Sequence, residues 1–234
     1  MGIADAQVDL RDTFMTTYAV LEAMKALGIK DLVFASSSAV YGDHGGNFAL
    51  REDTGPLLPI SNYGAMKLAS EALISAAVES FLDHAWIFRF PNVIGTPATH
   101  GVILDFIRKI KKTPKLLEVL GNGTQQKAYL HVSELVEGML FIVEKAREQI
   151  NLYNIGPPDE GCRIADIAAA VAERVSPGAE IVFGREGRGW VGDVPKFRYC
   201  IEKAEKIGWK PKLSSAEAMR LAVDEIARQE GLGC

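Results

Sequence analysis

The sequence predicts an α/β protein built around a parallel sheet. A short apolar run at 32–34 ends in three serines, as a buried parallel strand does at its carboxyl end. A helical segment opens near Tyr63, and a second apolar run follows at 85–90. A strand, a crossover helix and another strand form a right-handed parallel unit. Because ligands of such sheets bind at the carboxyl ends of the strands, we expect a site near the serines.

The other elements follow from apolar spacing. Residues 12–27 predict a helix with Phe14, Tyr18, Leu21 and Met24 on related faces, and Gly28 ends it as a C-cap. Further along, we expect strands at 129–132 and 181–183 and helices at 133–145, 164–175 and 216–228.

Composition limits the function classes. Hydrophobic residues make up 48% of the 234 residues, and the net charge is −4, so there is no electrostatic case for nucleic acid or an anionic membrane. No apolar run approaches the roughly 20 residues of a membrane span, and the first residues predict no signal peptide. The three cysteines, Cys162, Cys200 and Cys234, are too widely spaced for a disulfide framework or a metal site. We expect a cytoplasmic protein without a metal.

Tyr63 and Lys67 carry the most specific chemical signal. On a helix they lie on one face, one turn apart, and a lysine ammonium beside a phenol lowers the pKa of the tyrosine. Such a phenol exchanges protons near neutral pH. A YxxxK match alone is more often an ordinary solvated helix turn, so the serine-ended strand before it is needed to favour catalysis.

Several motifs in order add a family resemblance. They are SSSAVYG, YGAMK, RFPNVIG, GNGTQQKAYLHVSE, YNIG and GDVPKF. With them the chain resembles the extended short-chain dehydrogenases/reductases, the NAD-dependent sugar-nucleotide epimerases and dehydratases, most of all archaeal UDP-glucose 4-epimerase-like members. The resemblance implies part of a Rossmann domain at 1–95 and mainly a smaller α/β substrate-binding domain at 96–234. Within the latter, about 124–156 would return to the Rossmann sheet.

The family's glycine-rich turn, GxxGxxG or GxGxxG after a first strand, is missing from this sequence. We therefore expect an incomplete Rossmann domain whose strand at 32–35 has an open edge, and such edges invite association. Three explanations stay open: a fragment of a longer protein, a shortened reading frame, or a truncated relative that covers its edge by oligomerising.

The resemblance also implies roles for single residues. Ser37 would orient the substrate oxygen, Tyr63 would act as general base and acid, and Lys67 would hold the nicotinamide ribose of NAD. Further NAD contacts would come from Ser36, Phe90 and Pro91, and contacts to a UDP-sugar from Ser38, Asn92, Gly101, Val102, Lys127 and Arg188. The family also pairs the helices at 12–27 and 62–83 in a four-helix bundle, which implies a homodimer.

Departures from the family pattern bear on the reaction. The pair Ser38-Ala39 replaces the Asp-Glu pair of dehydratases, and because an alanine cannot exchange protons, dehydration is disfavoured. Lys127 stands where an arginine is usual, which keeps the charge but loses the bidentate fork. Ala128 replaces an aspartate, Thr13 an asparagine and Trp190 an arginine, and His131 is expected to pack in a strand.

Three functions remain open at this point. The first is a UDP-glucose/UDP-galactose 4-epimerase activity, with NAD held as a catalyst, that needs the missing half to be supplied. The second is another reaction of the family, a sugar-nucleotide reduction or decarboxylation. The third is a non-catalytic remnant that binds a nucleotide-sugar or a protein partner.

Overall fold

The computed structural model describes residues 5–45, 49–185 and 198–233. The chain begins with a long helical segment that runs from α1 (Ala6–Asp9) through a π-helical turn (Leu10–Met15) into α2 (Thr16–Leu27). The helix predicted at 12–27 is thus present but starts earlier. Gly28 ends α2 with a φ of 67°, which confirms the predicted C-cap.

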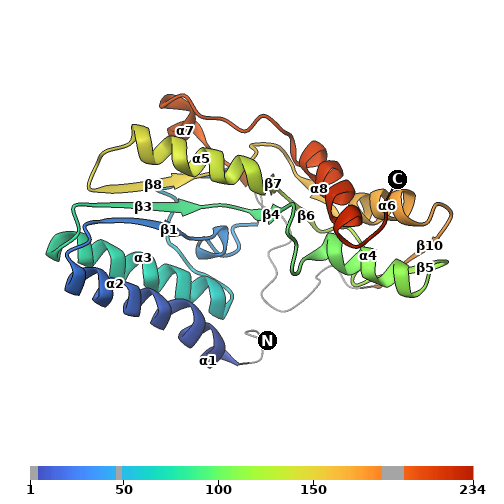
Figure 1. Cartoon of the computed structure of the whole chain (residues 1–234), viewed down its shortest axis with the longest axis horizontal. Helices are drawn as coiled ribbons and strands as arrows, with labels where there is room; N and C mark the ends of the chain where they lie inside the picture. Colours follow the sequence, from blue (N-terminus) through green and yellow to red (C-terminus); the bar gives the residue numbers. More distant parts are fainter. Residues whose placement is uncertain (1–4, 46–48, 186–197, 234) are drawn as a thin grey trace.

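A three-stranded parallel sheet forms the centre of the larger part of the molecule (Figure 1). Its order is β1 (Asp31–Ala35), β3 (His84–Arg89), β8 (Ile150–Asn154). Helices α2 and α3 (Asn62–Ser80) cover one face, and α5 (Val132–Lys145) covers the other. The predicted α/β fold with a strand, crossover helix and strand is confirmed.

Side chains of β3 alternate between two cores, as the two-residue period of a strand requires. Ala85 and Ile87 pack with α2 and α3, against Leu21 and Ile74. On the other face lie Trp86 and Phe88, in a core that also contains Leu135, Ile142, Tyr153 and Trp209. This double burial fixes the end of β3 firmly beside the end of β1.

The smaller part of the molecule consists of helices packed around their own core. It contains α4 (Val102–Lys112), α6 (Ile164–Val175) and α8 (Ser215–Gln229), with β5 (Leu116–Val119) paired in parallel with β10 (Glu180–Phe183). Apolar residues of all these helices form one cluster. In Figure 1 this part lies on the right, beyond the carboxyl ends of β1 and β3.

Short strands connect the two parts. Parallel pairs join β4 (Asn92–Ile94) to β7 (Tyr129–His131) and β2 (Ala49–Leu50) to β11 (Arg198–Tyr199), while β6 (Gln126–Lys127) and β9 (Cys162–Arg163) pair antiparallel. The remaining elements are a 3-10 turn (Ser38–Val40) and α7 (Glu202–Lys206). Residues from about 124 to 156 were expected to return to the Rossmann sheet. β8 joins this sheet and α5 packs on it, whereas β7 pairs with β4 instead.

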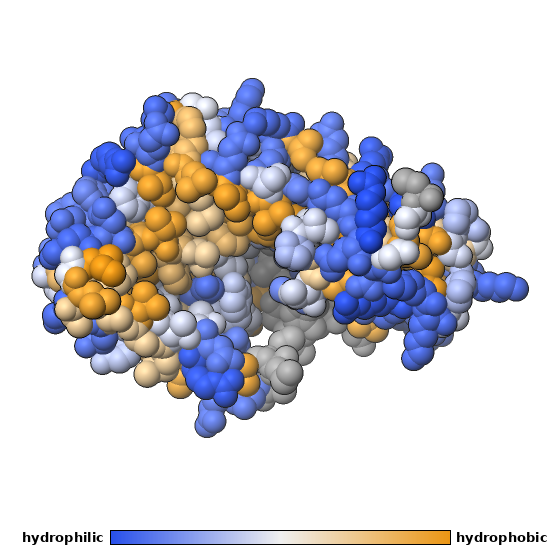
Figure 2. Space-filling model, viewed as in Figure 1, coloured by the Kyte–Doolittle hydropathy of each residue, from blue (hydrophilic) through white to orange (hydrophobic). Residues whose placement is uncertain are grey.

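One edge of the sheet is open among the strands that the structure describes. β1 pairs with β3 alone, and Val33 on β1 is 44% exposed. On the neighbouring helix α5, Val136 and Leu140 are 50% and 66% exposed. Figure 2 shows apolar residues gathered over α5 and the sheet beside it. In the described part of the chain, no helix has the length and apolarity to cross a membrane.

Candidate active site

A cavity of about 840 Å³ opens where β1 and β3 end. Eight of the residues predicted from the sequence line it: Ser37, Tyr63, Phe90, Pro91, Asn92, Gly101, Val102 and Lys127. They come from the serine turn, the start of α3, the end of β3, β4, the start of α4 and β6. Segments distant in sequence therefore converge on one hollow, although their roles remain predictions.

The three serines are fixed by the neighbouring strand. The backbone N–H of Ser36 donates to the carbonyl of Phe88 at 2.8 Å, and that of Ser38 donates to the carbonyl of Phe90 at 3.1 Å. Between them, Ser37 is the N-cap of the 3-10 turn, and its hydroxyl accepts the backbone N–H of Ala39. Ser37 is thus held at the cavity by backbone bonds on both sides.

Tyr63 stands in the first turn of α3. Ser61 caps this helix by accepting the backbone N–H of Gly64 at 3.1 Å. Tyr63 is 41% exposed, and both Tyr63 and Ser37 line the cavity. One turn later, the Lys67 ammonium lies 5.7 Å from the centroid of the Tyr63 ring and donates to the carbonyl of Ala35 at 2.8 Å.

The pKa of the phenol does not follow the sequence-based prediction. Burial raises the pKa of Tyr63, and the nearby Ser37 opposes this only in part. Burial also lowers the pKa of Lys67, against the attraction of Glu71. The prediction that Lys67 lowers the pKa of Tyr63 was wrong, because the Lys67 ammonium is directed at the carbonyl of Ala35 rather than at the phenol oxygen.

Beneath these residues lies a buried ion pair that the sequence analysis missed. Arg89 Nε and Nη2 donate to the two carboxylate oxygens of Glu71, at 3.0 and 2.6 Å, and the hydroxyl of Ser36 donates to the same carboxylate. The two charged side chains are 4% and 8% exposed. Two signals could have revealed the pair: Glu71 follows Lys67 by one helical turn, and Arg89 interrupts an apolar strand.

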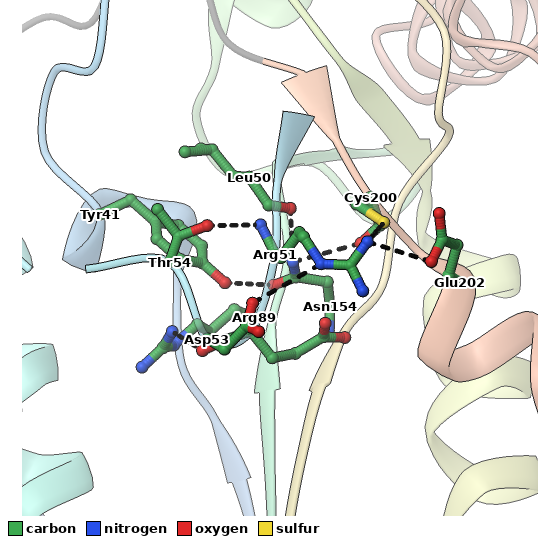
Figure 3. A network of polar contacts seen from close by, with 10 residues as sticks. Tyr41, Leu50, Arg51, Asp53, Thr54, Arg89, Asn154, Cys200 and Glu202 are labelled. Carbon is green, nitrogen blue, oxygen red and sulfur yellow. Dashed lines mark hydrogen bonds and ion pairs between the residues drawn. The ribbon is translucent and has the colours of Figure 1, made fainter. Parts of the chain in front are cut away.

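Figure 3 shows how Arg89 is held in turn. Its guanidinium lies 4.8 Å from the ring centroid of Tyr41, and its Nη1 donates to the carbonyl of Glu52. The Tyr41 hydroxyl donates to Asn154 Oδ1 at 2.7 Å, and Asn154 Nδ2 donates to the carbonyl of Leu50. Burial raises the pKa of Tyr41 to about 12, so this hydroxyl stays a donor at neutral pH. The network joins the site to β2 and β8.

Ser36, Ser38 and Lys67 do not line the cavity. The Ser36 hydroxyl is directed at Glu71, and the Ser38 side chain lies close to the buried phenol of Tyr199, whose pKa it lowers against the larger effect of burial. Arg188, like Trp190, lies outside the described residues. The structure adds Gln125 to the cavity lining; its side chain is 3% exposed, and its Oε1 has no hydrogen-bond partner among the described residues. Nothing in the sequence distinguished Gln125 within its motif.

His131, expected to pack in a strand, is buried in β7. Its Nδ1 lies 2.7 Å from the hydroxyl of Ser133, and its Nε2 lies 3.1 Å from Glu225 Oε2. These contacts tie β7 to α8, and they give the histidine a structural function.

The residues present fit one end of a nicotinamide dinucleotide. The Tyr63 hydroxyl is partly exposed at the cavity, and the Lys67 ammonium keeps N–H donors beyond the one used by Ala35. These are suitable partners for ribose hydroxyls. A helix preceded by a glycine-rich turn, which would hold the pyrophosphate, is not found in this sequence.

The chain belongs to the NAD-dependent epimerase/dehydratase family, whose model matches residues 2–156. It is 27% identical over 213 residues to a putative UDP-glucose 4-epimerase of Methanocaldococcus jannaschii, covering 89% of this chain and 67% of that protein. It is 28% identical over 229 residues to GDP-mannose 3,5-epimerase 1 of Oryza sativa, covering 92% and 58%. The chain thus spans roughly three fifths to two thirds of the length of these relatives.

Solved structures show the same fold. A UDP-galactose 4-epimerase superposes with a TM-score of 0.84 at 34% identity, covering 96% of this chain and 72% of that one. The UDP-glucose 4-epimerase of Thermus thermophilus, solved with NAD, gives a TM-score of 0.82 at 25% identity, covering 96% and 73%. These neighbours confirm the predicted Rossmann-type fold and the family's dependence on NAD.

Proposed function

We propose that this chain carries the catalytic residues of an NAD-dependent sugar-nucleotide epimerase that inverts C4 of a UDP-hexose, UDP-glucose or UDP-galactose. One observation carries the proposal: Ser37 and Tyr63, from separate elements, line the same cavity where parallel strands end. The names of the relatives support the same reaction class.

In this proposal Ser37 orients the substrate oxygen and Tyr63 transfers one proton. Ser37 donates a hydrogen bond to the C4 oxygen and holds it against Tyr63. Tyr63, acting as the phenolate, accepts the hydroxyl proton as the sugar is oxidised, and the resulting phenol returns it when the sugar is reduced from the other face. Bound NAD supplies the hydride acceptor and donor, with no net redox change. Ala39 offers no proton-exchanging group beside Ser38, which favours epimerisation over dehydration.

The nucleotide-sugar would lie along the rest of the cavity. The N-terminus of α4, at Gly101 and Val102, has no side-chain cap among the described residues, so its first backbone N–H groups suit a diphosphate. Lys127 brings a positive charge to the same lining, and Asn92 brings an amide. Arg188, outside the described residues, stays a predicted phosphate contact.

Apolar side chains on α2 remain exposed and suit contact with a second copy of this chain. We propose a homodimer through α2 and α3. Tyr18 and Val20 are both 44% exposed on α2, whereas Leu21 is buried in this chain's own core. A charge at Val20 therefore tests the dimer without emptying the core. Light scattering should give a dimer for the unchanged chain and a monomer for Val20→Asp; a monomeric unchanged chain would reject the dimer.

Product analysis tests the reaction. The purified chain is incubated with NAD and UDP-galactose, and the sugar is followed by proton NMR. The proposal predicts conversion to UDP-glucose and loss of that conversion in Tyr63→Phe. Decarboxylation of UDP-glucuronate, or net reduction of a sugar-nucleotide, would assign a different reaction of the family. An unreactive chain that still binds the nucleotide-sugar would show a non-catalytic binding module.

A further inference from the structure

Three ionisable residues follow one another along one face of α3. Tyr63, Lys67 and Glu71 are spaced by four residues, so each lies one turn from the next. A lysine and a carboxylate at this spacing commonly pair, and in this same protein Lys109 binds Asp105 at 2.9 Å in α4. Lys67 nevertheless donates to the carbonyl of Ala35.

The reason lies on the neighbouring strand. The guanidinium of Arg89 faces Glu71 with two parallel hydrogen bonds, one to each carboxylate oxygen, and Ser36 adds a third. Such a fork matches the geometry of a carboxylate in a way that an ammonium cannot. Three hydrogen bonds therefore already engage the two oxygens that would attract Lys67.

Further contacts hold the Arg89 side chain in this position. Its remaining Nη1 donates to the carbonyl of Glu52, and its plane lies over the ring of Tyr41. Tyr41 is itself fully buried and fixed by Asn154. The arginine thus approaches Glu71 from a rigid strand end, supported on its other sides.

We propose that Arg89 is a positioning residue for Lys67: by occupying both oxygens of Glu71, it keeps the ammonium out of an ion pair and free for the ligand beside Tyr63. This inference rests on the proposed function, since it gives Lys67 a ligand to hold. It adds that a residue 22 positions away, which does not line the cavity, keeps the Lys67 ammonium from pairing with Glu71.

Two substitutions should act on Lys67 in opposite directions. In Glu71→Gln the nearby carboxylate is lost while the buried Arg89 charge remains, so the pKa of Lys67 should fall. In Arg89→Met the carboxylate of Glu71 is released beside Lys67, so the pKa of Lys67 should rise. The ionisable groups facing Lys67 in this comparison are Tyr63 and Glu71 on α3 and Arg89 on β3.

The test is an NMR pH titration of the chain labelled with ¹³Cε-lysine, in the absence of NAD and sugar. Lys67→Arg identifies the Lys67 signal. Glu79→Gln is the matched control, because it removes the same charge from an exposed position of the same helix and should leave the signal unmoved. Circular dichroism confirms that each variant is folded.

Opposite shifts in the two variants are expected, but the loss of either charge alone would also produce them. The deciding variant is therefore Arg89→Lys, which keeps the charge but loses the fork to Glu71. A raised pKa of Lys67 in folded Arg89→Lys supports the proposal, and an unchanged value, or shifts of the same sign in the first two variants, would overturn it. Because no turnover is measured, failure of the epimerase assay and failure of this test are separate results.

Discussion

Gly64 offers the sharpest test of how the site is assembled, because it lies where α3 meets the serine turn. A Cβ added there would lie 2.4 Å from the carbonyl oxygen of Ala39 and 3.1 Å from the Cβ of Pro59. Ordinary van der Waals contact begins at 3.4 Å, so Gly64→Ala must separate the helix from the turn by about 1 Å. The same displacement separates Tyr63 from Ser37.

The sign of the change in the free energy of unfolding tests whether α3 lies this close to the serine turn. Helix propensity alone predicts that Gly64→Ala stabilises the protein by up to about 1 kcal/mol. Overpacking of this kind costs about 1–3 kcal/mol, so we expect a net loss of roughly 0.5–2 kcal/mol in the free energy of unfolding. A misplacement of about 1 Å should also reduce any turnover by about 100-fold.

Urea unfolding followed by circular dichroism measures the change. Ala72→Gly, at an exposed position of the same helix, is the control and should lose about 1 kcal/mol through propensity alone. If Gly64→Ala is as stable as the unchanged chain, or more so, the close approach of α3 to the serine turn is wrong.

Three further predictions concern the cap, a cysteine and the sheet edge. Ser61→Ala removes the N-cap of α3 and should lower the free energy of unfolding by about 1 kcal/mol in urea titrations; an unchanged midpoint would mean that the cap is dispensable. Burial raises the pKa of Cys162 to about 11, so its thiol stays protonated at pH 8. With Cys200 and Cys234 changed to serine, a thiol reagent should label it only after unfolding, and rapid labelling of the folded protein would contradict this. Val33→Lys should leave the proposed α2–α3 dimer intact in light scattering and change the free energy of unfolding by less than about 0.5 kcal/mol, since Val33 is 44% exposed; a large loss of stability would place it in a core.

Much of the fold followed from the sequence because periodicity reports directly on burial. The strands beginning at 31 and 84 and the helix between them were predicted from apolar runs, and Gly28 was recognised as a C-cap. Short pairings such as β4 with β7 were not, because three residues carry too little pattern to show a partner.

In the site, too, the residues in sequence motifs were predicted, whereas the contacts made by tertiary structure were not. Ser37 and Tyr63 lie in motifs with fixed spacing, and the structure brings both to the cavity. The pKa directions of Tyr63 and Lys67 could not be predicted, because they depend on burial and on which carbonyl the ammonium reaches. The pairing of Glu71 with Arg89 joins residues 18 positions apart, and only the tertiary structure places them together.

The most direct test of the central claim is a calorimetric titration of the chain with UDP-galactose. We expect saturable binding at one site, competed by UDP rather than GDP. Lys127→Met, which removes a charge from the cavity lining while keeping a similar volume, should weaken the affinity by about tenfold or more. No heat of binding up to millimolar UDP-galactose, from a chain shown to be folded, would contradict the claim that this cavity is a nucleotide-sugar site.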